Sequence, residues 1–306
     1  MPEPAESVMS GSVNFPASDY GNADPEWLKI DWRRHLHRVE LPGATVNYAE
    51  IGEGEPILFV HGLAGCWQNW LENLPHFGRT HRAIALDLPG FGESPMPSWP
   101  IGMPAYGQLI HDFCEKLGID RVAALVGNSM GGFVSTEAVI DQPSRFDRLV
   151  LVSAAGISFA EAIASLRGRV SLATFETAMS FLSRPHRTWL ARRRGRRYAF
   201  ANLVRYPNRL RPELLAELID PGLRSPGFPA AIRSIGGYDT RHRLTEIEIP
   251  TLVVWGMHDR IVPVEAAIGY HRLIPGSRLE LFERTGHLPQ LERPARFNQL
   301  LDEFLA

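Results

Sequence analysis

The sequence predicts an α/β fold in which a mostly parallel, eight-stranded sheet carries helices on both faces. Five short runs rich in Val, Ile and Leu are apolar along most of their length: residues 56–61, 82–87, 122–127, 148–153 and 250–256. Strands that are buried on both faces of a parallel sheet have this pattern. Helix-like segments separate these runs, and such alternation of strand and helix favours parallel strands joined by crossover helices.

Three further strands complete the predicted sheet. Residues 37–41 and 45–50 are more polar than the buried runs and are joined through Pro42 and Gly43. They predict an antiparallel hairpin at one edge of the sheet. Residues 278–283 form the last predicted strand.

The helices are predicted from apolar spacing and from end signals. Residues 105–117 have apolar side chains at 106, 109, 110, 113, 114 and 117, and Gly118 follows as a C-terminal cap. Residues 132–141, 264–274 and 294–305 are the other helices predicted within the core.

One segment interrupts the alternation. Residues 157–244 contain no buried-strand run, and chain breaks are predicted at 184–185, 206–207 and 220–222. So many helical residues between two strands predict an inserted helical lid. The core is then made of residues 35–156 and 245–306, and residues 1–34 are an N-terminal extension that frays or packs as a loose arm.

Composition excludes several classes of protein. The formal net charge of the 306-residue chain is −2, which gives no reason to expect nucleic acid as a partner. The two cysteines, Cys66 and Cys114, make neither a disulfide framework nor a metal site. We find no signal peptide and no membrane span, so a soluble, cytoplasmic protein without metal or cofactor is expected.

A nucleophilic serine is predicted at Ser129. It lies in the sequence Gly127-Asn128-Ser129-Met130-Gly131, which matches G-x-S-x-G and connects a predicted strand to a predicted helix. A serine on such a sharp turn has strained backbone geometry, which is tolerated only when the neighbouring residues are small. The turn also directs a helix N-terminus toward a developing oxyanion.

The serine requires a base, and the base requires an acid. His287 follows the last strand in a loop, from which it can reach the top of the sheet. Asp259 follows the strand at 250–256, whereas the preceding strand ends without a carboxylate. Asp259 is therefore the candidate acid by position and by elimination, and the order Ser129, Asp259, His287 is the one expected for a strand–turn–helix nucleophile of this kind.

An oxyanion hole is predicted from two backbone N–H groups. His61-Gly62-Leu63 follows the first buried strand, and the N–H of Leu63 is one expected donor. The N–H of Met130, directly after the nucleophile, is the other.

With these motifs in order, the chain resembles the α/β-hydrolase superfamily over residues 39–305. The stretch 87–94 (DLPGFGES) resembles the family's D-x-x-G-x-G-x-S loop, and 286–294 (GHLPQLERP) is similar to its histidine loop and closing helix. The insertion at 157–244 is placed where the family has its lid. The resemblance implies an α/β-hydrolase fold and a small-molecule substrate, with a hydrophobic acyl compound favoured.

Three functions are weighed. The first is a carboxylesterase or lipase-like hydrolase, which is our main prediction. The second is a carbon–carbon bond hydrolase, because Asn128 is similar to the residue before the serine in meta-cleavage-product hydrolases. Those enzymes usually have tryptophan where this chain has Leu288, and their glycine-rich oxyanion loop is not reproduced in residues 61–66. The third is a ligand receptor that uses the fold as a binding module, which a complete triad argues against.

The segment 184–211 contains ten arginines and no acidic residue. We favour a solvated face of the lid, and contact with an anionic membrane or a substrate carboxylate is the less favoured interpretation. The sequence predicts no oligomeric state.

Overall fold

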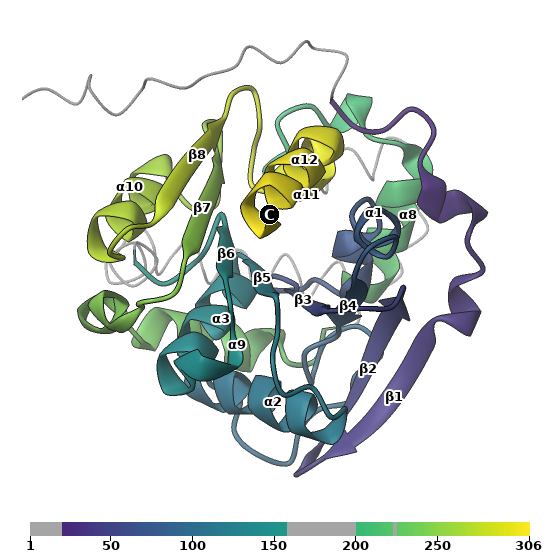
Figure 1. Cartoon of the computed structure of the whole chain (residues 1–306). Helices are drawn as coiled ribbons and strands as arrows, with labels where there is room; N and C mark the ends of the chain where they lie inside the picture. The colour runs from purple at the N-terminus through teal and green to yellow at the C-terminus, as the bar shows by residue number, and fades with distance from the viewer. Residues whose placement is uncertain (1–19, 158–199, 223–224) are drawn as a thin grey trace, which may run out of the picture.

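The computed structural model describes residues 20–157, 200–222 and 225–306, and within these ranges a single sheet organises the chain (Figure 1). Its eight strands lie in the order β1-β2-β4-β3-β5-β6-β7-β8. The strands from β4 to β8 along this order pair in parallel, while β2 pairs antiparallel with both β1 and β4. The predicted fold class is therefore confirmed, including the antiparallel hairpin at one edge.

The strands agree with the predicted runs to within one or two residues at each end. Their bounds are β1 Leu36–Leu41, β2 Ala44–Ile51, β3 Pro56–Val60, β4 Arg82–Leu86, β5 Ala124–Asn128, β6 Leu149–Val152, β7 Thr251–Gly256 and β8 Arg278–Phe282.

Helices cover both faces of the sheet (Figure 1). One face carries α2 (Met103–Lys116), α3 (Met130–Asp141) and α10 (Val264–Leu273). The other face carries α1 (Leu74–Phe77), α11 (Pro289–Glu292) and α12 (Pro294–Leu305). Short 3-10 helices connect the elements, at Glu26–Lys29, Trp32–Arg34, Trp67–Trp70, Pro143–Arg145, Pro207–Arg209 and Arg241–Glu246.

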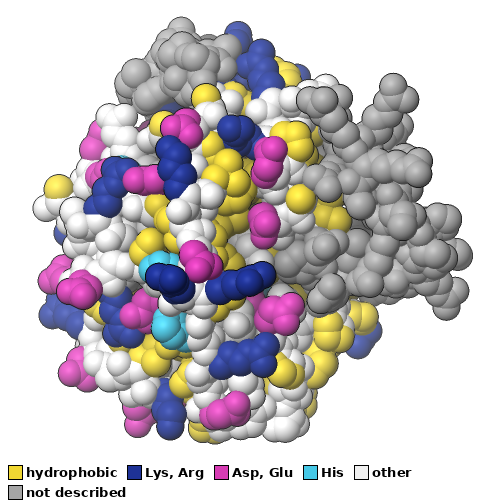
Figure 2. All heavy atoms as spheres, turned by 90° about the vertical axis from the view of Figure 1, so that its right-hand side faces the viewer, with side chains coloured by type: hydrophobic (Ala, Val, Ile, Leu, Met, Phe, Trp, Pro, Cys, Tyr) yellow, Lys and Arg dark blue, Asp and Glu magenta, His cyan; other side chains and the backbone are white. Residues whose placement is uncertain are grey.

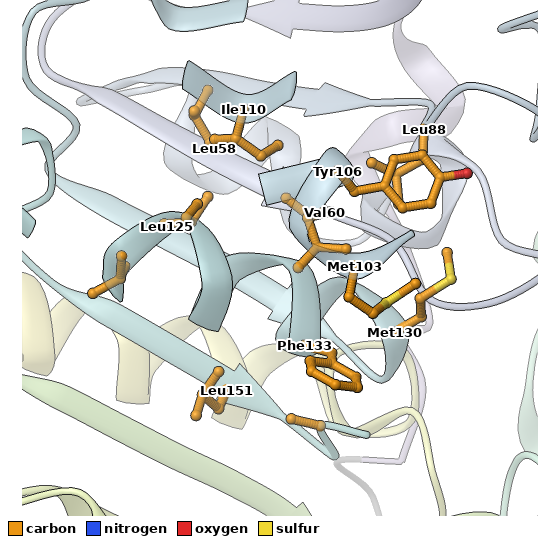
Figure 3. Packing of buried hydrophobic residues seen from close by; sticks show 14 of the residues in the cluster. Leu58, Val60, Leu88, Met103, Tyr106, Ile110, Leu125, Met130, Phe133 and Leu151 are labelled. Carbon is orange, nitrogen blue, oxygen red and sulfur yellow. The ribbon is translucent and has the colours of Figure 1, made fainter. Parts of the chain in front are cut away.

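The buried strands divide their side chains between two cores. In β3, Leu58 and Val60 belong to the core under α2 and α3, while Ile57 and Phe59 belong to the core under α1 and α12. Because successive side chains of a strand point to opposite faces, both sets must be apolar, which explains the continuous apolar runs. Figure 3 shows the first core, where Val60 of β3 is drawn together with Met103 of α2 and Phe133 of α3.

The described part of the inserted segment is helical. It contains α8 (Pro212–Gly222) and α9 (Phe228–Gly237). The break predicted at 206–207 falls at the start of a 3-10 helix, whereas α8 continues through Pro221 as far as Gly222. The break predicted at 184–185 and most of the arginine-rich segment 184–211 lie outside the described residues.

The N-terminal extension packs against the core from Tyr20 onward. Tyr20 and Trp27 are both buried, and the indole N–H of Trp27 donates a hydrogen bond to Glu72. Residues 1–19 lie outside the described ranges. The part from 20 to 34 is thus a packed arm, which the sequence left open as one of two outcomes.

Charged side chains of both signs are interspersed on the face shown in Figure 2, on both sides of a band of hydrophobic side chains. Among the described residues, no helix is long and apolar enough to cross a membrane.

Candidate active site

Ser129 occupies the turn between β5 and α3. Its backbone has φ 55° and ψ −116°, a conformation that residues with a Cβ rarely adopt and that costs about 1–3 kcal/mol. The turn is held on both sides, because the Ser129 N–H donates to the carbonyl oxygen of Val152 (2.9 Å) and its own carbonyl accepts from the N–H of Ala155 (3.0 Å). The predicted strained strand-to-helix turn is present.

The glycines around Ser129 are required by close backbone contact. A Cβ on Gly127 would lie 2.3 Å from the carbonyl oxygen of Gly131, and one on Gly131 would lie 2.2 Å from that of Val60. A Cβ on Gly62 would lie 3.0 Å from the Cβ of Ser129. The glycines at 62, 127 and 131 therefore let β3, β5 and α3 approach one another at the nucleophile.

His287 and Asp259 form a buried pair. Nδ1 of His287 lies 2.7 Å from Oδ2 of Asp259, and the two side chains are 4% and 0% exposed. The other carboxylate oxygen of Asp259 accepts the backbone N–H groups of Ile261 (2.8 Å) and Val262 (3.0 Å). These bonds hold the carboxylate beside the ring, which favours the tautomer with its proton on Nδ1.

Asn128 joins the nucleophile turn to the histidine loop, by which we mean residues 284–288. Its side-chain nitrogen donates to the carbonyl oxygen of Val152 (3.0 Å) and to that of His287 (3.4 Å). The residue before the serine thus contacts the backbone of the histidine. The structure thus pairs His287 with Asp259 and places Asn128, which directly precedes Ser129, against the backbone of His287.

The oxyanion loop, residues 61–66, follows β3 and is fastened by His61. Nε2 of His61 accepts the N–H of Leu88 (2.9 Å), and Nδ1 lies 2.7 Å from the carbonyl oxygen of Gly62. Both ring nitrogens are therefore used by the backbone, and burial lowers the pKa of His61 to about 4. His61 is a neutral support of the loop.

Asp87, directly after β4, holds Trp67, the residue that follows this loop. Its carboxylate accepts the N–H of Trp67 (2.6 Å), the N–H of Glu93 (3.0 Å) and the side-chain amide of Asn47 (2.8 Å). Burial raises the pKa of Asp87 to about 6 in spite of these donors. The D-x-x-G-x-G-x-S stretch is thus a brace for the oxyanion loop.

The two expected oxyanion donors lie on elements that flank Ser129. Met130 is the first residue of α3, where backbone N–H groups have no intrahelical partner. Leu63 follows Gly62, whose close approach to Ser129 is described above. Their role remains a proposal.

One site residue was missed by sequence reasoning. Glu292, in α11, is fully buried, and its Oε1 accepts the N–H of Gly286 (2.8 Å) and that of Leu288 (3.4 Å), on either side of His287. Burial raises the pKa of Glu292 to about 7. An acidic residue within the apolar stretch five positions after the histidine was the signal that could have identified it.

In the part of the chain that the structure describes, no group of three or more His, Cys, Asp or Glu residues is arranged so that it could hold a metal ion. Cys66 and Cys114 are both buried, and neither forms a disulfide. Burial raises the pKa of each thiol, which disfavours the reactive thiolate.

Comparison with known proteins agrees with this geometry. The sequence profile described as alpha/beta hydrolase fold matches residues 55–294. The chain is 30% identical to a 2-hydroxy-6-oxo-6-phenylhexa-2,4-dienoate hydrolase of Comamonas testosteroni, over 88% of this chain and 94% of that protein. It is 29% identical to a 2-hydroxy-6-oxo-2,4-heptadienoate hydrolase of Pseudomonas putida, over 86% and 94%. Among solved structures, a thermophilic esterase from Thermogutta terrifontis matches with a TM-score of 0.73 and 26% identity, over 88% of this chain and 98% of that one.

Proposed function

Because the chain belongs to the α/β hydrolase fold family and is a hydrolase, we propose that it cleaves a small or medium-sized hydrophobic carboxylic ester through an acyl-enzyme. The observation that carries the proposal is the buried Asp259–His287 pair, which is tied by Asn128 to the strained turn that bears Ser129.

In the proposed reaction, His287 removes the proton of the Ser129 hydroxyl as its oxygen attacks the ester carbonyl. The imidazolium that forms is stabilised by Asp259 and then protonates the leaving alcohol. A water molecule, activated by the same imidazole, hydrolyses the acyl-enzyme and frees Ser129. The two backbone donors of Asp259 keep its carboxylate oriented toward the ring.

The tetrahedral intermediates carry a negative oxygen that needs donors fixed in advance. The backbone N–H groups of Met130 and Leu63 supply them in this proposal, and each is worth ~3 kcal/mol of barrier. The bracing of the oxyanion loop by His61 and Asp87 keeps the Leu63 donor from having to reorganise during the reaction.

A carbon–carbon bond hydrolase is the second candidate, and the names of two relatives favour it. Such a substrate carries a carboxylate that must be held while the molecule is ketonised. Asn128 is the residue that suggested this chemistry, but its amide nitrogen donates to the protein's own carbonyl groups at Val152 and His287. The amide is thus already used within the protein, and Leu288 stands where meta-cleavage-product hydrolases usually have tryptophan. Both observations favour an ester as the substrate.

The two candidate functions predict different preferred substrates, and both substrates can be compared on one enzyme preparation. We expect measurable turnover of short p-nitrophenyl esters, abolished by Ser129→Ala, and little turnover of a 2-hydroxy-6-oxo-dienoate. The measurement is kcat/KM for both substrates. If the dienoate wins by ~100-fold, which is ~2.7 kcal/mol of differential transition-state binding, the ester proposal is wrong and the second candidate stands.

A further inference from the structure

Three segments that are distant in sequence meet at the carboxylate of Glu292. They are the N-terminal arm at Tyr20, residues 203–206 within the inserted segment, and the histidine loop. Each oxygen of the carboxylate accepts two hydrogen bonds: Oε1 from the backbone N–H groups of Gly286 and Leu288, and Oε2 from the Arg205 N–H and the Tyr20 hydroxyl. Four donors are about the full capacity of an ionised carboxylate.

The inserted segment also contacts the backbone of His287 directly. The N–H of His287 donates to the carbonyl oxygen of Leu203 at 2.7 Å, two residues before the Arg205 N–H that reaches Glu292 at 2.7 Å. A Cβ on Gly286 would lie 2.9 Å from the same Leu203 oxygen and 3.0 Å from the Arg205 nitrogen. Residues 203–205 therefore pack closely along the histidine loop.

Tyr20 fastens this contact from the other side. Its hydroxyl donates to Glu292 and accepts the N–H of Tyr206 at 2.8 Å. The next residue, Gly21, donates its N–H to the carbonyl oxygen of Glu292 at 2.8 Å. The Arg293 guanidinium lies 5.0 Å from the centre of the Tyr20 ring. The arm is thus attached to both the inserted segment and the helix that follows His287.

We propose that Tyr20 and Glu292 are positioning residues that hold residues 203–206 against the histidine loop and thereby set the place of His287. The N-terminal arm becomes part of the apparatus that orients the base, although neither Tyr20 nor Glu292 meets the substrate.

The stability of this contact depends on every hydrogen-bond donor to the Glu292 carboxylate. Burial raises the pKa of Glu292 to about 7 even with its donors in place, and burial also raises the pKa of Tyr20. Removing the Tyr20 hydroxyl leaves one oxygen of Glu292 short of a donor and the Tyr206 N–H without its acceptor. An unmet buried polar group costs ~1–3 kcal/mol, which displacement of residues 203–206 relieves.

Tyr20→Phe tests the proposal in the full-length protein, with Tyr238→Phe as the matched control. Tyr238 also donates its hydroxyl to a buried glutamate, Glu137 of α3, at 2.9 Å. Both variants lose one tyrosine–glutamate hydrogen bond, so both lose stability. Two readouts separate positioning from stability: the NMR resonance of the His287 Nδ1 proton, assigned with His287→Ala, and kcat against KM for a short p-nitrophenyl ester.

We expect Tyr20→Phe to shift or broaden the His287 resonance and to lower kcat about tenfold with little change in KM, while Tyr238→Phe changes neither. A His287 resonance that is the same in Tyr20→Phe and the wild type overturns the proposal. The kinetic readout rests on the proposed function, whereas the resonance does not. A wild-type protein that hydrolyses no ester counts against the ester proposal, and the resonance still decides the role of Tyr20.

Discussion

The oxyanion loop and the histidine loop each place a buried histidine at the carboxyl edge of the sheet, but the two histidines do opposite things. His61 gives one ring nitrogen to the N–H of Leu88 and sets the other against the carbonyl oxygen of Gly62. His287 gives Nδ1 to the carboxylate of Asp259. His61 thus has both ring nitrogens engaged by the backbone, whereas His287 is held by a carboxylate at Nδ1, as its proposed role as a base requires.

The aspartates that lie beside these two loops, Asp87 after β4 and Asp259 after β7, also differ in their partners. Asp87 is surrounded by the donors of its own brace, two backbone N–H groups and the amide of Asn47. Asp259 uses one oxygen for two backbone N–H groups and leaves the other for His287. Hydrogen-bond partners therefore distinguish the two aspartates, since residue type and side-chain burial are shared.

The largest expected effect separates the two aspartates. Asp259→Asn should lower kcat by ~10⁴ with the fold intact, because the imidazole loses the tautomer that leaves Nε2 free. Asp87→Asn is the matched control. It should lower the free energy of unfolding by ~1–3 kcal/mol, because the new side-chain NH2 group would face the N–H donors that now bond to the carboxylate. Its effect on kcat should be far smaller. Ester kinetics and urea unfolding of both variants provide the test. Near-normal kcat in Asp259→Asn would show that another group is the acid.

A smaller effect, the pH dependence of stability, tests the role of His61 as a brace. Burial lowers the pKa of His61 to about 4, whereas the unfolded chain binds a proton near 6.5. The stability contributed by neutral His61 is thus complete above pH 6.5 and is lost as the pH falls toward 4. Between pH 7 and pH 5 the wild type should lose ~2 kcal/mol more unfolding free energy than His61→Gln, a residue that does not titrate.

Urea unfolding of the wild type and His61→Gln at both pH values measures that difference. An equal loss in the two proteins would mean that His61 is protonated in the folded state, and the oxyanion loop would then not be braced as described.

The sequence was sufficient for the strands, and it singled out the residues of the candidate site, because both depend on local patterns. Buried strands need apolar side chains on both faces, so residues such as Ile57 and Leu58 identified β3 directly. Gly127 and Gly131 fit the motif that identified the turn at Ser129, and a Cβ on Gly127 would collide with Gly131, which is close in the sequence.

Long-range polar contacts could not be predicted in this way. Tyr20 and Glu292 are 272 residues apart, and nothing in the spacing of either one indicates the other. Likewise, Asn128 suggested a carbon–carbon bond hydrolase, and only the fold shows that its amide nitrogen donates to the carbonyl groups of Val152 and His287. The helix α8, which continues through Pro221, was misjudged at its end because a proline near a helix end is compatible with either outcome.

The most direct test of the central claim is chemical labelling of the nucleophile. A fluorophosphonate probe reacts with a serine only where a base and an oxyanion hole activate it. Peptide mapping after labelling of the native protein should find the probe on Ser129 alone, with labelling lost in Ser129→Ala. Labelling of the native protein that persists in Ser129→Ala, or that maps to another serine, would contradict the assignment of Ser129, His287 and Asp259 as the catalytic triad.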